Sequence, residues 1–230
     1  VAKELTTLNL YDKQKSVEID LAVGLPPSRY GTQHKSSANY FKKESKTIKF
    51  DYQNQGEICI TIKSISVYPQ AFAATTYQYD KLKNEIAAII VDIGGMTVDY
   101  LMLREGVASL EESGSIDRGV INMYNDLNRF ISGKYGINMT EADIDLVAEE
   151  KVSRFSADLR EDVNDGIVEY VGSLIRVLSE RGFDFRIHKP VFVGGGSILL
   201  KSYITTAIKI TDPMFIDNIK ANVERYELLY

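Results

Sequence analysis

The run from Ile89 to Tyr100, IIVDIGGMTVDY, constrains the fold more than any other part of this 230-residue sequence. An apolar segment ends in Asp92, two glycines follow, and Thr97 opens a second apolar segment that carries Asp99. This pattern predicts two strands joined by a tight turn. Glycines let backbone approach a ligand with no Cβ in the way, and successive N–H groups in such a turn form a nest for anions. An acid at the end of the first strand suits a hydrated magnesium ion, which takes only one or two carboxylates.

The same run also fits a β-hairpin whose glycines supply only the turn geometry, and spacing alone does not separate the two interpretations. A second cluster, Gly194-Gly195-Gly196-Ser197, favours a ligand site. It follows the β-branched and aromatic residues 191–193 and precedes a helical pattern. Three glycines between a strand and a helix allow flat backbone to lie against a ribose and adenine. A simple helix N-terminus does not need three glycines, so the two clusters together indicate a nucleotide site.

Composition narrows the class of protein. The net charge of −5 and pI near 5.2 argue against a general electrostatic attraction to nucleic acid, so no direct contact with nucleic acid is expected. Cys59 is the only cysteine, which rules out an internal disulfide and fits a reducing cytoplasm. No apolar stretch approaches the length of a membrane span and no signal peptide is visible, so we expect a cytoplasmic protein without a membrane contact. The sequence begins with Val1 and no initiator Met, which predicts a fragment of a longer protein.

Hydrophobic periodicity predicts an α/β chain. We expect strands over residues 16–23, 47–52, 58–67, 86–91, 97–103, 107–110 and 191–193. Pro26 and Pro27 are expected to open a loop. Helices are expected to cover residues 70–79, 117–131, 155–179 and 197–207. Two further helices are expected to end near residues 12 and 43, one to begin after a cap at Thr140, and one to include residues 219–223. Apolar residues at intervals of three and four mark 155–179 as a long amphipathic helix.

Four motifs, in this order, resemble the actin-like ATPases of the ParM/StbA plasmid-segregation group: AVGLP at 22–26, VYPQA at 67–71, DIGGMTVD at 92–99 and VGGGS at 193–197. The resemblance covers essentially the whole chain. Its glycine motifs are shared by the wider superfamily of actin, DnaK-type chaperones and sugar kinases, whereas the Gly-Leu-Pro and Pro-Gln elements are typical of the ParM-like branch. The resemblance implies an α/β, actin-like (ribonuclease H-like) fold of two domains, with residues 1–80 completing the first and residues 81–230 forming the second.

The resemblance also implies how a nucleotide and its metal would be held. Asp92 matches the acid that binds magnesium through water. The four residues after Ile93 match the second phosphate loop, which offers backbone amides and a hydroxyl to the terminal phosphates: Gly94, Gly95, Met96 and Thr97.

The remaining site residues are implied in the same way. Gly194, Gly195 and Gly196, with Ser197, match the adenosine motif. Gln70 falls where this branch commonly has a glutamate that orients the attacking water, and an amide can position a water without acting as a base. We expect Gln70 to have this role; the alternative is a helix-entry residue with no chemistry.

One part of the superfamily pattern is missing from the sequence. A first phosphate loop should lie near the N-terminus, and nothing in residues 1–60 matches it. We therefore expect the N-terminal strands and that loop to be missing, either because the parent protein is longer or because the chain is a degenerate member of the superfamily; the missing initiator Met favours a fragment. We do not expect this piece alone to hydrolyse ATP.

The implied function is that of an ATPase that binds magnesium with ATP or ADP in a cleft between domains and polymerises into head-to-tail filaments for plasmid or DNA segregation. The acidic charge suits contact with DNA through a basic adaptor protein rather than directly. Two alternatives stay open. A sugar-type kinase of the same superfamily would show substrate-dependent ADP release, and a non-catalytic binding module would not bind magnesium–ATP.

Overall fold

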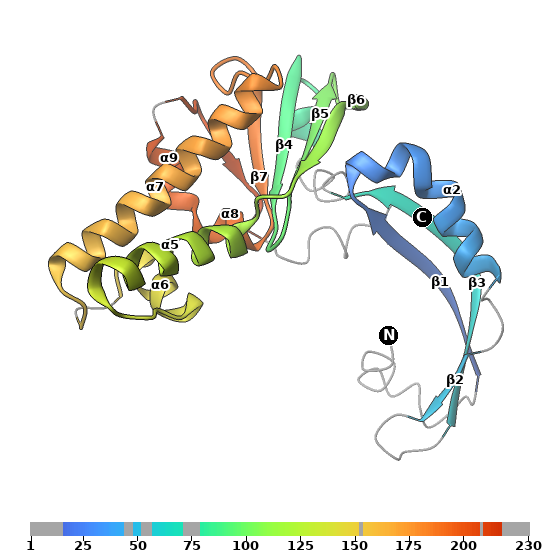
Figure 1. The fold of residues 1–230 in the computed structure, drawn as a ribbon. Coiled ribbons are helices and arrows are strands. Elements are labelled where there is room, and N and C mark those ends of the chain that lie inside the picture. The colour runs from blue at the N-terminus through green and yellow to red at the C-terminus, as the bar shows by residue number, and fades with distance from the viewer. Residues whose placement is uncertain are drawn as a thin grey trace.

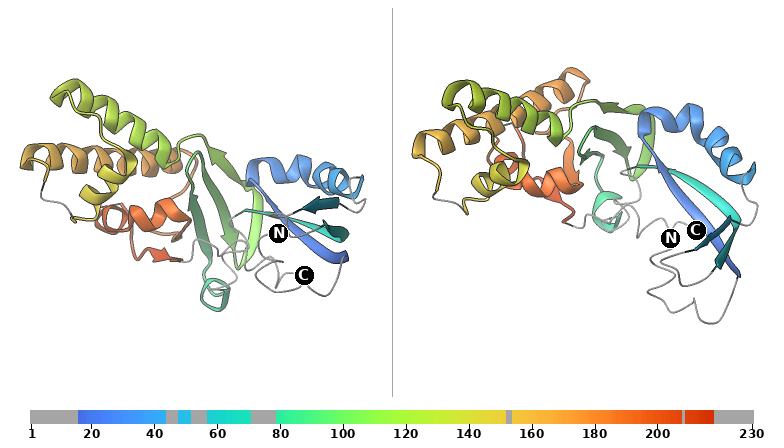
Figure 2. Two further views of the ribbon diagram at one scale, coloured as in Figure 1. Left: turned by 90° about the horizontal axis from the view of Figure 1, so that it is seen from below. Right: turned by 60° about the horizontal axis from the view of Figure 1, so that its bottom comes forward.

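The computed structural model describes residues 16–43, 48–51, 57–70, 79–151, 154–207 and 209–217. The strands among these residues form two separate sheets, one of three strands and one of five. Helices α5, α7, α8 and α9 lie on one side of the five-stranded sheet, and the smaller sheet with helix α2 lies on the other (Figures 1 and 2). The expected α/β class is therefore confirmed. The division into domains at residues 80 and 81 stays a prediction.

The first sheet has the order β1-β3-β2. Strand β1 (Ser16–Leu25) runs parallel to β3 (Glu57–Pro69), and β2 (Ile48–Asp51) pairs with β3 as the predicted antiparallel hairpin. Helix α2 (Pro27–Lys43) starts directly after β1. The expectation that Pro26 and Pro27 open a loop was wrong for Pro27, because proline at the first helical position has the required φ and lacks an N–H that would have no intrahelical partner there.

The second sheet has the order β6-β5-β4-β7-β8. Strands β4 (Ala87–Ile93), β5 (Val98–Arg104) and β6 (Val107–Ile116) form an antiparallel meander, as the sequence predicts. Strands β7 (Lys189–Val193) and β8 (Met214–Phe215) continue the sheet in parallel to β4. Strand β4 is therefore central, which explains its nearly continuous apolar sequence.

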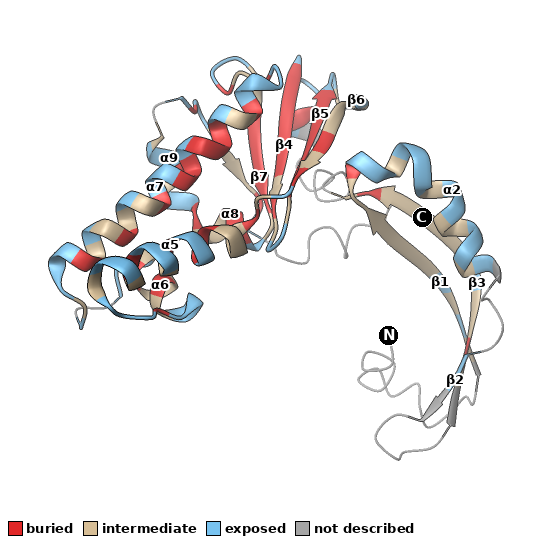
Figure 3. Ribbon diagram, in the orientation of Figure 1, coloured by how far each residue is buried: buried red, intermediate tan, exposed pale blue. Residues whose placement is uncertain are grey.

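The core lies on both faces of this second sheet, where buried residues gather (Figure 3). Alternate residues of β4, among them Ile89 and Val91, face the larger cluster formed with helices α5 and α7. Ala88 and Ile90, with Leu101 of β5, belong to a smaller cluster on the opposite face. Because side chains alternate along a strand, Asp92 lies on the side of this smaller cluster, away from α5 and α7.

The helices of this half follow the predicted pattern with shifted ends. Helix α7 (Ala157–Glu180) buries all six residues of the predicted apolar stripe: Leu159, Val163, Ile167, Val171, Leu174 and Leu178. Helix α6 (Glu141–Ala148) has a complete capping box between Thr140 and Asp143. Helix α5 (Val120–Tyr135) begins three residues later than expected, and a short helix α4 (Tyr79–Leu82) precedes β4. The expected single helix over 197–207 is two, α8 (Gly195–Leu199) and α9 (Lys201–Thr206). The helices expected before residue 12 and at 219–223, and most of 70–79, fall outside the described residues.

Candidate functional site

The turn between β4 and β5 is a tight connection. The N–H of Gly94 donates to the carbonyl of Thr97 at 2.9 Å, and Ile93 pairs with Val98 to close the hairpin. The side chain of Met96 is 67 % exposed. The residues predicted for the phosphate loop thus form one compact turn directly after Asp92.

The start of helix α5 holds this turn through its backbone. The N–H groups of Gly119, Val120 and Ile121 donate to the carbonyls of Met96, Gly94 and Gly95, at 3.0, 3.1 and 2.9 Å respectively. A Cβ built on Gly119 would lie 2.3 Å from the Gly95 oxygen, so only glycine allows this approach. The N-terminal donors of α5 are therefore used inside the protein and are not offered to a ligand.

This contact determines where the amides of the turn point. The described chain has no cis peptide bond, and a trans peptide unit directs its N–H opposite to its C=O. Because the carbonyls of residues 94, 95 and 96 face α5, the N–H groups of Gly95, Met96 and Thr97 face away from it. None of these three groups donates to a backbone carbonyl among the described residues. They form a row of three donors on the outer side of the turn, which is the geometry of an anion nest.

The second glycine cluster lies against Asp92. Strand β7 places Val193 in register with Asp92, and Gly194 follows with a φ of 86°. A Cβ on Gly194 would lie 2.3 Å from Oδ1 of Asp92, so this glycine leaves room for the carboxylate. Gly195 is exposed and a Cβ there would meet nothing within 4 Å. The loop is therefore closed toward Asp92 and open at Gly195.

Two of the predicted site residues lie differently from the rest. Ser197 is fully buried and donates its hydroxyl to the Gly194 carbonyl at 2.7 Å, so its side chain supports the loop. Gln70 lies at the end of β3 in the other sheet, where its N–H donates to Leu25 at 2.8 Å. The structure thus brings Asp92, the turn and the glycine loop together and places Gln70 on the opposite sheet.

A row of polar side chains runs from Asp92, through Asp99 of the same motif, to two serines that the motifs did not identify. Asp99 pairs with Asp92 across the hairpin, and Ser115 of β6 pairs with Asp99 and donates to it at 2.5 Å. The hydroxyl of Ser28, in the first turn of α2, lies 2.9 Å from that of Ser115. Burial raises the pKa of Asp99, and the hydrogen bond from Ser115 opposes this rise. Only the tertiary structure could have joined Ser115 and Ser28 to the two acids, because these serines are far from the motif in the sequence.

The donor set suits an anion with a hydrated cation better than a directly bound metal. No group of three or more His, Cys, Asp or Glu side chains able to hold a metal occurs within the part of the chain that the structure describes. Magnesium keeps most of its waters and needs one or two carboxylates, a condition that Asp92 meets beside the room left by Gly194. The row of N–H groups then supplies what phosphate oxygens require.

Comparison with solved structures defines the class of protein. The archaeal actin homologue Ta0583 in complex with ADP is 17% identical, with a TM-score of 0.71 over 98% of this chain and 76% of that one. The Alp12 filament structure is 15% identical, with a TM-score of 0.70 over 99% and 72%. Bacillus thuringiensis ParM with ATP is 14% identical, with a TM-score of 0.65 over 99% and 70%. The chain therefore has an actin-like fold, as the motifs predict.

Family models identify the chain more closely. The model described as archaeal actin homologue MreB-like, C-terminal, matches residues 90–206, and the model for the N-terminal domain of actin-like proteins matches residues 1–72. The chain belongs to the family of actin-like proteins. A comparison with curated proteins gives no match.

Proposed function

We propose that this actin-like chain binds magnesium–ATP at the Asp92–Thr97 turn and the glycine loop 194–196. The observation that carries the proposal is the row of three N–H groups on the outer side of the turn, which follows from the bonds of its carbonyls to α5. The solved relatives that contain ADP and ATP support the same assignment.

Each residue has a defined part in this proposal. The amides of Gly95, Met96 and Thr97 would bind the terminal phosphates, and the Thr97 hydroxyl would add a further donor. Gly194–Gly196 would lie against the adenosine, with Gly195 as the exposed contact. Magnesium bound through water by Asp92 would offset the charge of the phosphate oxygens. In a protein that also has the first phosphate loop, Gln70 would align a water for attack, which requires the first sheet to close toward the second around the nucleotide.

We further propose that nucleotide binding drives head-to-tail assembly for DNA segregation. Repeated heterologous contacts produce open filaments, and a solved relative is a filament. The net charge of −5 favours a basic adaptor protein as the link to DNA. No helix among the described residues has the length and hydrophobicity needed to cross a lipid bilayer. We place the protein in the cytoplasm as part of the same proposal.

The nucleotide part is tested by calorimetric titration of the chain with ATP, with and without magnesium. Asp92→Asn should weaken magnesium–ATP binding by about tenfold or more, which is roughly 1.4 kcal/mol. Asp165→Asn makes the same chemical change at an exposed carboxylate on α7 and should leave binding unchanged. Equal binding by both variants would remove Asp92 from the site.

The filament part is tested separately by pelleting and light scattering after magnesium–ATP is added. Scattering that rises for the unmodified chain and stays flat for Asp92→Asn supports nucleotide-driven assembly. Nucleotide binding without pelleting contradicts the filament and leaves the nucleotide site intact. ADP release that depends on an added sugar would instead indicate a kinase, and no magnesium–ATP binding would indicate a non-catalytic module.

A further inference from the structure

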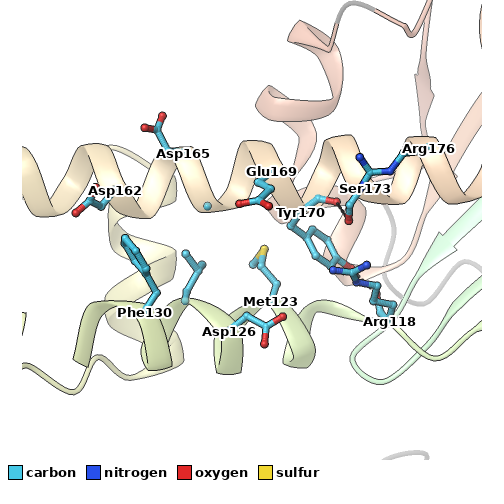
Figure 4. A pocket seen from close by; sticks show the side chains of 12 residues that line it. Arg118, Met123, Asp126, Phe130, Asp162, Asp165, Glu169, Tyr170, Ser173 and Arg176 are labelled. Carbon is cyan, nitrogen blue, oxygen red and sulfur yellow. Dashed lines mark hydrogen bonds between the residues drawn. The ribbon is translucent and has the colours of Figure 1, made fainter. Parts of the chain in front are cut away.

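Helices α5 and α7 run side by side in opposite directions and leave a groove of about 440 Å³ between them (Figure 4). Its apolar lining includes Met123 and Leu127, which are buried, and Phe130, which is 51 % exposed at one end. Gly166 of α7 faces Leu127 so closely that a Cβ would lie 2.4 Å from Cδ2 of Leu127. The absence of a side chain at position 166 therefore leaves the room that the Leu127 side chain occupies.

This α5–α7 groove is distinct from the nucleotide site proposed above. None of the residues that line it belongs to the Asp92–Thr97 turn or to the Gly194–Ser197 loop. The amides of the turn also point away from α5. A role for the groove therefore does not depend on nucleotide binding.

The charged residues around the groove differ in whether they have partners. Asp162 accepts hydrogen bonds from Lys134 at 2.5 Å and from the Tyr135 hydroxyl at 2.6 Å, and Asp126 lies 3.3 Å from Arg129. These two carboxylates are thus paired within the protein. They add little attraction for a charged ligand, since their charges are already offset.

Four other charged groups at the groove have no ion-pair partner among the described residues. Asp165 and Glu169 are exposed carboxylates on α7. Arg118, beside Tyr170, and Arg176, beside Ser173 on α7, lie at the end of the groove away from Phe130 (Figure 4). The groove therefore offers unpaired negative charge along its middle and unpaired positive charge at one end.

This pattern indicates the chemistry of an occupant. A third helix can pack into the groove between two helices, whereas an added strand would find no sheet edge there. The apolar lining calls for an apolar face on that helix. The unpaired carboxylates disfavour the negatively charged backbone of a nucleic acid. Because the groove has unpaired groups of both signs, the partner helix should carry both basic and acidic residues.

We propose that the α5–α7 groove is a docking site for an amphipathic helix of a partner protein. The partner helix places an apolar residue on Phe130, a basic residue at Glu169 and Asp165, and an acidic residue at Arg118 and Arg176. Glu169 and Arg176 are seven residues apart on one helix, which corresponds to about 10 Å. The basic and acidic residues of the partner are accordingly about two helical turns apart.

The test uses two fluorescent helical peptides with the same apolar stripe. One has lysine and glutamate about two turns apart in the proposed order, and its twin has the two charges exchanged. The unmodified chain should bind the first peptide about tenfold more tightly than the twin, measured by anisotropy at low salt. The variant Asp165→Lys/Glu169→Lys should lose this preference, and Phe130→Ala should weaken binding of both peptides about tenfold.

A matched control carries the same charge change on another part of α7. Glu161→Lys/Glu180→Lys alters two exposed acids that do not line the groove and should retain the preference. Thermal unfolding of all variants shows that each is folded. The proposal is overturned if neither peptide binds, or if the charge-reversed groove keeps the original preference. It is also overturned if the chain self-associates and the groove variant abolishes that association, because the occupant would then be a second copy.

Discussion

The hydroxyl of Ser28 on α2 lies 2.9 Å from the hydroxyl of Ser115 on β6, and this contact joins the helix of the first sheet to the edge of the second. Ser115 uses its own proton to donate to Asp99, so Ser28 is the donor of the first bond when Asp99 is ionised. Asp99 is paired with Asp92 in the hairpin. The carboxylate proposed to bind magnesium is thus linked through two strands to the neighbouring sheet.

Replacing Ser115 with alanine removes the donor to a buried carboxylate. We expect the free energy of unfolding to fall by about 1–3 kcal/mol, the cost of leaving such a group unsatisfied. Ser28→Ala breaks only the bond between two hydroxyls at an exposed position and should cost less than about 1 kcal/mol. Urea unfolding followed by circular dichroism measures both, and equal losses would show that Ser115 does not act through Asp99.

The pH dependence of stability should contain a contribution from Asp99. Burial raises the pKa of this carboxyl in the folded chain above its ordinary value of 3.8. The folded state therefore binds the proton more tightly than the unfolded chain, and this contribution to stability is lost as pH rises from about 4 through the raised pKa. Asp99→Asn removes the titration, so its free energy of unfolding should fall less than that of the unmodified chain over this interval. Parallel curves from urea unfolding at a series of pH values would contradict the assignment.

Gly194 and Gly195 form a matched pair for testing the glycine loop. Gly194→Ala introduces a side chain at a φ of 86° and a Cβ 2.3 Å from the Asp92 carboxylate. The backbone strain alone should cost about 1–3 kcal/mol, and displacement of the carboxylate should weaken magnesium–ATP binding. Gly195→Ala meets nothing within 4 Å and should change stability by less than about 1 kcal/mol. Thermal unfolding and calorimetric titration compare the two, and a tolerated Gly194→Ala would show that the loop can move away from Asp92.

Gly119 and Gly133 provide a second pair, at the start and in the interior of α5. A Cβ on Gly119 would lie 2.3 and 2.6 Å from the carbonyl oxygens of Gly95 and Gly94, which belong to backbone and cannot rotate away. We expect Gly119→Ala to cost about 2 kcal/mol or more and to weaken ATP binding, because the turn loses the contact that orients its amides. Gly133→Ala is unhindered and should stabilise the chain by up to about 1 kcal/mol. Normal ATP affinity in a folded Gly119→Ala protein would show that ATP binding does not depend on the contact between the turn and α5.

Most of the fold could be predicted from periodicity and motif order. The hairpin in the first sheet, the central strand β4, the meander and the stripe of α7 all follow from residue patterns that repeat within a few positions. The differences occur at the ends of helices. Pro27 starts a helix of 17 residues because proline suits the first helical position, and Leu200 separates α8 from α9 where the sequence predicts one helix.

The sequence by itself determined which residues belong to the candidate site, because two glycine clusters after apolar strands need no distant partner to be recognised. Only the tertiary structure decided how these residues are arranged relative to one another. The direction of the turn amides depends on the carbonyl bonds to α5, and the room beside Asp92 depends on the register of β4 with β7. The row from Asp92 to Ser28 likewise joins residues from four elements. Such relationships arise from strand pairing and helix packing between distant segments, which local sequence patterns do not encode.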